Sequence, residues 1–438
     1  MKGEVEIQRI WVIIISIAFF TGIGMISATV SQNEFYSLLF WYSLSFLSFI
    51  GIYYYAENIP ALALITIAIS ARMLTFLSPP QLSDDYNRFY WDAKVSELGI
   101  SPYSLTPEEY SSLDSTSLTI ELKESLNSPN YYSVYPPGLQ YIYSTALYFS
   151  DGSISSFANQ VRMLYLIVEI LIILLFIRAT KSKNWVIYAL NPLVIIELTG
   201  NLHAEVFVVL GLVLILTQKT WSQILGWAVA IGSKISPIIW LPLWGLQIRR
   251  NLPWINVFAI TGLLGLLFWP LMKHPDLLLN FYQSLRLYFQ TFEFNGSIYV
   301  LSRELAMLYF GYNPIAIIGP SLQIVLILII LSISWSYRKI QYKLLANPMY
   351  YIFLMYLLFA TTVHPWYIVP LVALVSLQWK WSGIIWSYTI IFSYIYYSEA
   401  TEWEKTIFHS IQYLALMTGL FIDIGQKKAR KKLPGFKF

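Results

Sequence analysis

Apolar segments of roughly membrane-spanning length follow one another along most of the chain of 438 residues. A transmembrane helix needs about 20 consecutive apolar residues, because it must cross a hydrocarbon core about 30 Å thick. The candidate segments lie at 10–30, 37–55, 60–78, 157–178, 185–200, 203–218, 222–236, 237–248, 253–272, 315–337, 348–363, 366–378, 382–398 and 405–424. We therefore expect an all-α, polytopic transmembrane helix bundle with about 11 to 14 spans, forming a single integral-membrane domain over 1–438.

The composition excludes several classes of protein. Apolar residues make up 57% of the chain and charged residues only 12%, against roughly 25% charged in soluble domains. The absence of Cys excludes disulfides, thiolate metal sites and cysteine nucleophiles. No glycine-rich nucleotide loop is present, which argues against a nucleotide-driven pump. The net charge of +4 is small, and its placement along the chain says more than its size. We expect membrane lipids and no nucleic acid as partners.

The basic residues fall in groups that all lie on one side if the N-terminus is cytoplasmic, as the positive-inside rule requires. These groups are Lys2 and Arg9; Arg178, Lys181 and Lys183; Lys219, Arg249 and Arg250; Arg338, Lys339 and Lys343; Lys380; and the basic tail 424–438. The loops 79–156 and 273–314 are then external. The apolar stretch 137–150 cannot cross, because a crossing there would place Lys181 and Lys183 outside. We expect it to lie in the outer interface as a helix.

The external loop 79–156 carries the strongest chemical signal. The carboxylate pair Asp84–Asp85 follows an apolar segment directly, where such a pair is costly unless a base or a cation site requires it. The elements that follow are Tyr86, Phe89, Trp91-Asp92-Ala93, Gly99, Ser101-Pro102-Tyr103 and Tyr135-Pro136-Pro137-Gly138. Alternatively, the aspartates cap a helix that begins near Tyr86. Capping accounts well for one aspartate but poorly for two.

This order of elements resembles the first luminal loop of type C glycosyltransferases. The closest resemblance is to bacterial polyprenol-phosphate-mannose-dependent transferases and to the catalytic subunit that adds the first mannose to glycosylphosphatidylinositol. Their pattern is Asp-x-Asp-Tyr, Phe-x-Asp-Ala, Gly-x-Ser-Pro-Tyr and Tyr-x-Tyr-x-Pro-Leu. Here Asp84 and Asp85 lack the intervening residue, and Gly138 stands in place of Leu. The detailed match covers roughly 60 residues, and register against Tyr86 favours Asp85 as the counterpart of the family's catalytic aspartate.

The resemblance implies a single catalytic domain that transfers a hexose, with mannose as the best guess, from a polyprenyl-phosphate donor. The acceptor would be a hydroxyl of a lipid-linked glycan or cell-envelope glycoconjugate on the external face of the membrane, here the plasma membrane of a bacterium. Transfer would proceed by inversion with an aspartate base. No cofactor is certain, although Asp84 and Asp85 could hold a divalent cation such as Mg²⁺ or Mn²⁺.

The chemistry assigns further roles. Asp85 is the candidate base for the acceptor hydroxyl, and Asp84 would position it, hold the acceptor or share a cation. The departing phosphate needs positive charge, for which Arg162, Lys234 and Arg88 are the candidates. Arg162 could equally be a snorkelling membrane anchor, and Lys234 could snorkel inward.

Other polar residues are expected to bind substrate at the same external level. They are Asp92, Tyr135, Asn201, His203, Glu205, Glu293, Asn295, His364 and Trp366. The segments Asn-Pro, Gly-Asn-x-His and His-Pro-Trp-Tyr also resemble segments of the bacterial transferases. His203 and Glu205, two residues apart, do not share a helical face and would not form a metal site alone. His364-Pro365-Trp366 could instead be a helix start with an interfacial aromatic residue.

A transporter or flippase for lipid-linked sugars is the alternative function. Such a protein would be expected to spread charges to the membrane midplane and to show internal repeats. In this chain the polar clusters gather on one predicted face, and inspection reveals no repeat.

Overall fold

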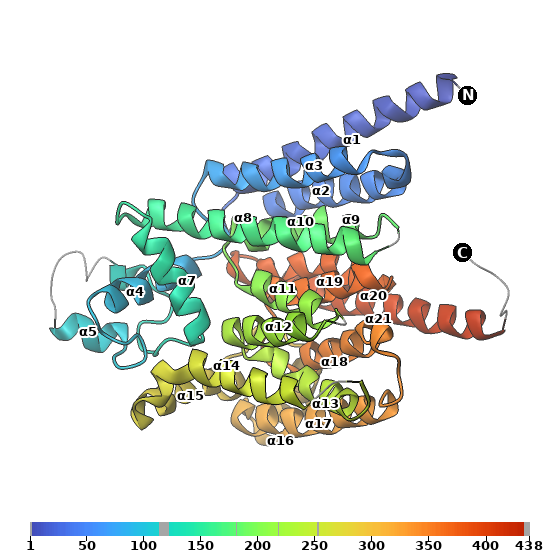
Figure 1. The fold of residues 1–438 in the computed structure, drawn as a ribbon. Helices are drawn as coiled ribbons and strands as arrows, with labels where there is room; N and C mark the ends of the chain where they lie inside the picture. The colour runs from blue at the N-terminus through green and yellow to red at the C-terminus, as the bar shows by residue number, and fades with distance from the viewer. Residues whose placement is uncertain (1, 114–121, 181, 218, 252–253, 433–438) are drawn as a thin grey trace. The chain divides into compact units, whose positions relative to one another are not determined.

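The computed structural model describes residues 2–113, 122–180, 182–217, 219–251 and 254–432 (Figure 1). Within these ranges the chain is helical, and its β structure consists of one isolated bridge between Phe294 and Thr362, which confirms the predicted all-α class. The chain divides into two compact units, a division that the sequence did not predict. The first unit comprises Met1–Leu77, Phe176–Glu197 and His364–Phe438, and the second comprises Ser78–Leu175 and Leu198–Val363.

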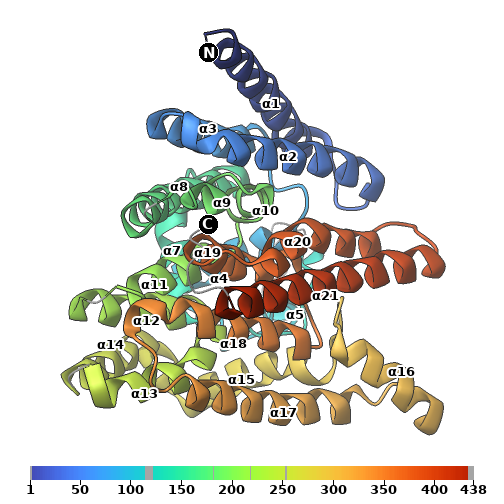
Figure 2. The same ribbon diagram turned by 90° about the vertical axis from the view of Figure 1, so that its right-hand side faces the viewer.

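The first unit draws its helices from both ends of the chain. In it α1 (Lys2–Thr29) packs along α2 (Phe35–Tyr55), and α20 (Trp381–Thr389) packs along α21 (Glu402–Lys432), as Figure 2 shows for the last pair. Its other elements are η1 (Ala56–Asn58), α3 (Ala61–Leu74), η2 (Thr75–Leu77), α9 (Trp185–Ala189), α10 (Pro192–Val194), η6 (Pro365–Ile368), α19 (Val369–Leu377) and η7 (Ile390–Tyr397). The basic tail 424–438 belongs to this unit, and its last residues lie outside the described ranges.

The second unit contains the external loop predicted from the sequence and the central helices. Here α4 (Asp85–Glu97) packs on α7 (Pro137–Tyr148), and α11 (Glu205–Ile215) packs on α12 (Thr220–Ser233). Its other elements are α5 (Pro107–Leu113), η4 (Ser236–Trp240), α13 (Leu241–Asn251), α14 (Ile255–Met272), α15 (Pro275–Gln290), α16 (Ile298–Phe310), α17 (Ile315–Ser336), η5 (Tyr342–Leu344) and α18 (Ala346–Phe359). Two elements continue from one unit into the other, α8 (Ile154–Ala179) and the π-helix η3 (Ile195–Gly200).

Six helices in the described part of the chain are long and apolar enough to cross a membrane. They are Gln8–Thr29, Phe35–Asn58, Ile154–Ala179, Ile255–Met272, Ile315–Ser336 and Glu402–Gln426. The bent pair Pro192–Gly200 and Glu205–Ile215 would make a seventh if it is one span. The chain is therefore a multi-pass integral membrane protein.

The remaining predicted spans correspond to shorter helices. The segments 60–78, 348–363 and 366–378 match the shorter apolar helices Ala61–Leu77, Ala346–Phe359 and Pro365–Leu377. A helix of 14 residues, such as α12, is about 21 Å long and would not cross a hydrocarbon core of about 30 Å by itself. Six or seven spans meet the criteria of length and composition, so the larger count of 11 to 14 stays a prediction.

The stretch predicted to lie in the outer interface forms α7, whose 12 residues are too few to span a bilayer. Pro137 occupies its first turn, where a fixed φ and a missing N–H are favourable. A Cβ atom on Gly138 would lie 2.3 Å from the carbonyl oxygen of Gly232, at the end of α12. This close approach explains why position 138 is a glycine.

Candidate functional site

The Asp84–Asp85 pair lies at the start of α4. Asp84 occupies the N-cap position, but within the described loop its side chain makes no capping hydrogen bond. Both carboxylates instead accept hydrogen bonds from the side-chain amide of Asn127, with N···O distances of 2.9 Å to Asp84 and 3.2 Å to Asp85. Helix capping therefore does not account for the hydrogen bonds of this pair.

Three other residues predicted for the site lie around Asp85. The Nδ1 atom of His203 is 3.9 Å from the Oδ2 atom of Asp85, and Lys234 forms an ion pair with Glu205. The charges of Lys234 and Glu205 both act on Asp85. The side chains of His203 and Glu205 are each 3% exposed, whereas that of Lys234 is 28% exposed. We call the following residues the carboxylate cluster: Asp84, Asp85, Asn127, His203, Glu205 and Lys234.

The surroundings of Asp85 increase its affinity for a proton. Burial raises the pKa of Asp85 to about 6, and the negative charges of Asp84 and Glu205 act in the same direction. The hydrogen bond from Asn127 and the charge of Lys234 oppose this rise in pKa. The Asp85 side chain remains 24% exposed, so solvent can reach it. A carboxylate whose pKa approaches neutrality, at a polar site open to solvent, can serve as a general base.

The turn before α11 positions His203. The Oδ1 atom of Asn201 accepts a hydrogen bond of 3.3 Å from the backbone N–H of Leu82, which joins this turn to the segment that leads into Asp84. Leu202 is fully buried and has φ = 65°, a left-handed conformation that is rare for a bulky residue. Such a conformation persists only where the surrounding structure enforces it, and it is found preferentially at functional sites.

Arg162 supports the same turn from α8. Its Nε atom donates to the carbonyl of Thr199 and its Nη2 atom to the carbonyl of Gly200, both at 3.0 Å. Its Nη1 atom lies 3.4 Å from the Oδ1 atom of Asn159, and the residue is 1% exposed. These contacts give Arg162 a role in holding the end of η3, while its predicted contact with a donor phosphate stays a prediction.

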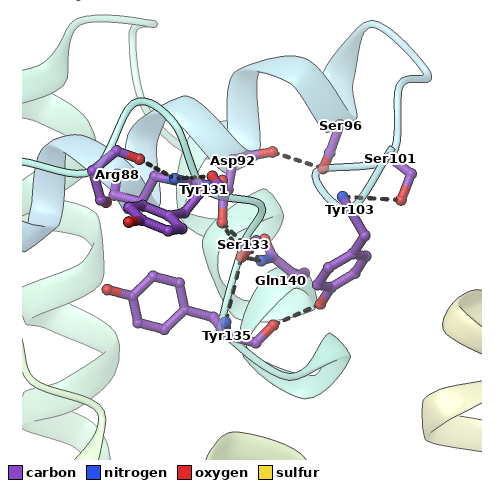
Figure 3. Close-up of polar contacts among 10 residues, drawn as sticks. Arg88, Asp92, Ser96, Ser101, Tyr103, Tyr131, Ser133, Tyr135 and Gln140 are labelled. Carbon is purple, nitrogen blue, oxygen red and sulfur yellow. Dashed lines mark hydrogen bonds and ion pairs between the residues drawn. The ribbon is translucent and has the colours of Figure 1, made fainter. Parts of the chain in front are cut away.

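A second polar group of the loop surrounds Asp92 rather than Asp85 (Figure 3). The Nε atom of Arg88 lies 2.8 Å from the Oδ1 atom of Asp92. The Oδ2 atom of Asp92 accepts hydrogen bonds from Ser133 and Gln140. We call Arg88, Asp92, Ser133 and Gln140 the loop network. Its hydrogen bonds give Arg88 and Asp92 a role in holding the loop together, and their predicted contacts with donor phosphate and substrate stay predictions.

Tyr135 connects the loop network to the aromatic core of the loop. Its ring packs edge to face against Phe89 and Tyr143, and its carbonyl accepts a hydrogen bond of 2.6 Å from the Tyr103 hydroxyl. Phe89 and Tyr143 stack on each other with their ring centroids 4.5 Å apart. Tyr135 is therefore part of the packing that fixes α4 on α7, whether or not it also contacts a substrate.

Glu293 and Asn295 lie in the segment before α16. Glu293 accepts hydrogen bonds from Tyr299 and Asn313 and is bridged by Arg303, with an N···O distance of 2.6 Å. Asn295 has φ = 49° and donates to the carbonyl of Val363 at 3.3 Å. Both side chains have partners that fix this segment, and their predicted contacts with substrate stay predictions.

His364 and Trp366 belong to the first unit. Their rings stack with centroids 4.4 Å apart and an interplanar angle of 3°. His364 stands at the N-cap position of η6, whose first residue is Pro365. The alternative of a helix start carrying an aromatic residue therefore agrees with the local structure, and substrate binding by the two residues stays a prediction.

The described residues do not form a set of ligands for a resident metal ion. Among them, no group of three or more His, Asp or Glu side chains could hold a cation. Two carboxylates can hold Mg²⁺ together with water or substrate oxygens, and here Asp84 and Asp85 share an amide N–H donor. Cation binding by Asp84 and Asp85 therefore stays a prediction.

Sequence reasoning missed Asn127, Ser133 and Gln140. All three occur in a polar stretch or at the start of an apolar one, and none belongs to a motif of recognisable spacing. Only the folded loop brings them to Asp85 or Asp92.

Comparison of the chain with protein-family models, with curated proteins and with solved structures found no match.

Proposed function

We propose that the chain is a membrane-embedded glycosyltransferase of type C, which moves a hexose from a polyprenyl-phosphate donor to an acceptor hydroxyl. One observation carries this proposal most strongly. Asp85 is partly exposed at the start of a helix, has a pKa raised to about 6, and is surrounded by His203, Glu205 and Lys234. Clusters of like charges with shifted pKa values occur preferentially at functional sites.

The proposed reaction needs one base and an activated leaving group. The acceptor oxygen attacks the anomeric carbon of the sugar while Asp85 takes the hydroxyl proton, and the bond from that carbon to the phosphate oxygen breaks. The configuration at the anomeric carbon inverts, and the polyprenyl phosphate leaves with the bonding electron pair. Lys234, whose side chain is 28% exposed to solvent, is the cation of the cluster that could stabilise the phosphate charge.

The resemblance of the first external loop supports the choice of donor and acceptor class. The Asp-Asp-Tyr, Gly-x-Ser-Pro-Tyr and Tyr-x-Pro elements occur in the order found in mannose-transferring enzymes that use polyprenol phosphates. For this reason mannose is the preferred sugar of the proposal. The external side of a bacterial plasma membrane is the proposed location, because the basic groups all lie on one side if the N-terminus is cytoplasmic.

A panel of radiolabelled polyprenyl-phosphate sugars tests the proposal directly. Membranes containing the protein should transfer label from polyprenyl-phosphate mannose to a lipid-linked or glycan acceptor, and should transfer other hexoses more slowly. Membranes without the protein provide the background rate.

A flux measurement in reconstituted vesicles, made beside the transfer assay, separates the enzyme from the transporter. If no donor in the panel gives a labelled product, but a labelled lipid-linked sugar crosses the bilayer of reconstituted vesicles, the proposed transferase is wrong. Transfer of label without movement of intact donor across the bilayer would support the transferase.

A further inference from the structure

The segment 125–131 lies against the start of α4, and hydrogen bonds run both from α4 to this segment and from this segment to the Asp84–Asp85 pair. Asn87 of α4 donates to the carbonyl of Ser125 at 3.1 Å, and Arg88 donates to the carbonyls of Ser128 and Tyr131 at 3.2 and 2.9 Å. We call this segment the strap. Because donors of α4 hold it on both sides of residue 127, the strap has a defined place over the first turn of that helix.

Asn127, in the middle of the strap, donates hydrogen bonds to both carboxylates of the pair. Its Nδ2 atom lies 2.9 Å from Asp84 Oδ1 and 3.2 Å from Asp85 Oδ1. A carboxamide nitrogen has two N–H groups, so a single side chain can serve both carboxylates at once. The opposite amide orientation would place the Asn127 oxygen against two carboxylate oxygens, and these atoms are all acceptors that repel one another. The amide nitrogen must therefore face the pair.

Several charged and titratable groups face Asp85 from the surrounding elements. Asp84 precedes it, His203 and Glu205 approach from the turn and start of α11, Lys234 follows α12, and Tyr143 of α7 interacts with it. Asp84 and Glu205 repel a charge on Asp85, whereas Lys234 attracts it. Asn127 is the uncharged donor that binds both adjacent carboxylates, and its hydrogen bond to Asp85 favours the ionised form of that residue.

We propose that Asn127 is a positioning residue, which fixes the two carboxylates relative to each other and keeps Asp85 ionised and oriented for proton abstraction. As a step in catalysis this role rests on the proposed glycosyltransferase function. Asn127 acts through Asp85 and need not touch the sugar. Its position also gives the long loop a function, because the strap brings a donor to a site that lies 42 residues earlier in the chain.

The decisive variant is Asn127→Leu, which keeps the approximate size of the side chain and removes both donors. The matched control is Asn130→Leu, an exposed asparagine of the same strap. Purified full-length protein is treated with a carbodiimide, which reacts with protonated carboxyl groups, over a range of pH. Tandem mass spectrometry then separates the modification of Asp85 from that of Asp84.

The midpoint of Asp85 modification should move upward by roughly 0.5–1 pH unit in Asn127→Leu and stay in place in Asn130→Leu. The acid limb of sugar transfer should move by the same amount, so that activity lost near pH 6 is largely recovered at higher pH. An unchanged midpoint, or equal loss of activity at every pH, would overturn the proposal and leave Asn127 a structural residue.

The carbodiimide experiment also distinguishes this inference from the proposed function. It requires no sugar transfer, so a shifted midpoint in a protein that transfers no sugar would reject the transferase while supporting the role of Asn127. Normal transfer by the native protein with an unshifted midpoint in Asn127→Leu would support the transferase and reject the role of Asn127.

Discussion

Two carboxylates of one helix, Asp85 and Asp92, have opposite surroundings. In the loop network, Asp92 is fully buried and accepts hydrogen bonds from Arg88, Ser133 and Gln140, of which Arg88 is positively charged (Figure 3). In the carboxylate cluster, Asp85 is partly exposed and lies beside Asp84 and Glu205, whose charges repel its own.

The difference separates a group that stabilises the fold from a group that is held at a cost in stability. A buried charge is tolerated when hydrogen bonds and an opposite charge satisfy it, as they do at Asp92. Repulsion among neighbouring carboxylates lowers stability, and natural proteins accept such local conflicts mainly at functional sites. These surroundings favour Asp85 rather than Asp92 as the reactive group.

The largest effect is expected for Asp85→Asn. This change preserves size but removes basicity, so sugar transfer should fall by about 10²–10⁴-fold. Asp84→Asn should cost less if Asp84 only orients its neighbour. If Asp85→Asn remains active while Asp84→Asn or Asp92→Asn abolishes transfer, the base has been assigned to the wrong residue. If all three purified variants transfer sugar at the normal rate, the proposed mechanism fails.

Stability provides the control for this variant. Burial and the charge of Asp84 raise the pKa of Asp85 from its ordinary value of 3.8 to about 6. Its contribution to stability is therefore present below pH 3.8 and is lost as the pH rises through about 6. At pH 7.5 the native protein bears the cost of the charge, so Asp85→Asn should unfold at the same temperature or a higher one.

The activity of the native enzyme should rise with pH through about 6, because the base must be ionised.

Asp92→Asn should act on the fold instead. The substitution leaves the guanidinium of Arg88, whose side chain is 6% exposed, facing a neutral amide. Removing one partner of a buried ion pair typically costs about 3–5 kcal/mol, which thermal unfolding in detergent would detect as a large fall in the midpoint temperature. A stable Asp92→Asn protein that binds acceptor poorly would instead support the substrate role predicted from the sequence.

The sequence predicted much of the fold and part of the site. Hydropathy identified the six long apolar helices, because each contains a continuous apolar segment near the required length. The residues near Asp85 were predictable where they interrupt apolar segments, as Lys234 does, or follow one, as His203 and Glu205 do. Asn127 was not predictable, because its role depends on the path of a polar loop that has no periodicity. Nor could the sequence reveal that Arg88 pairs with the Asp92 carboxylate, or that Arg162 donates to two backbone carbonyls.

Arg162→Met gives the smallest expected effect and tests how firmly the carboxylate cluster is held. Arg162 is 1% exposed, and its guanidinium donates to the carbonyls of Thr199 and Gly200, which lie four and three residues before His203. Loss of charge-assisted hydrogen bonds of this kind costs roughly 1.5–3 kcal/mol. Because the turn would misplace His203 relative to Asp85, the loss should lower kcat, with the KM for donor nearly unchanged. Arg162→Lys retains the charge but not the planar fork that reaches two carbonyls, so it should restore little activity. A raised KM for donor in Arg162→Met, with substantial rescue by Lys, would instead show that Arg162 binds the donor phosphate.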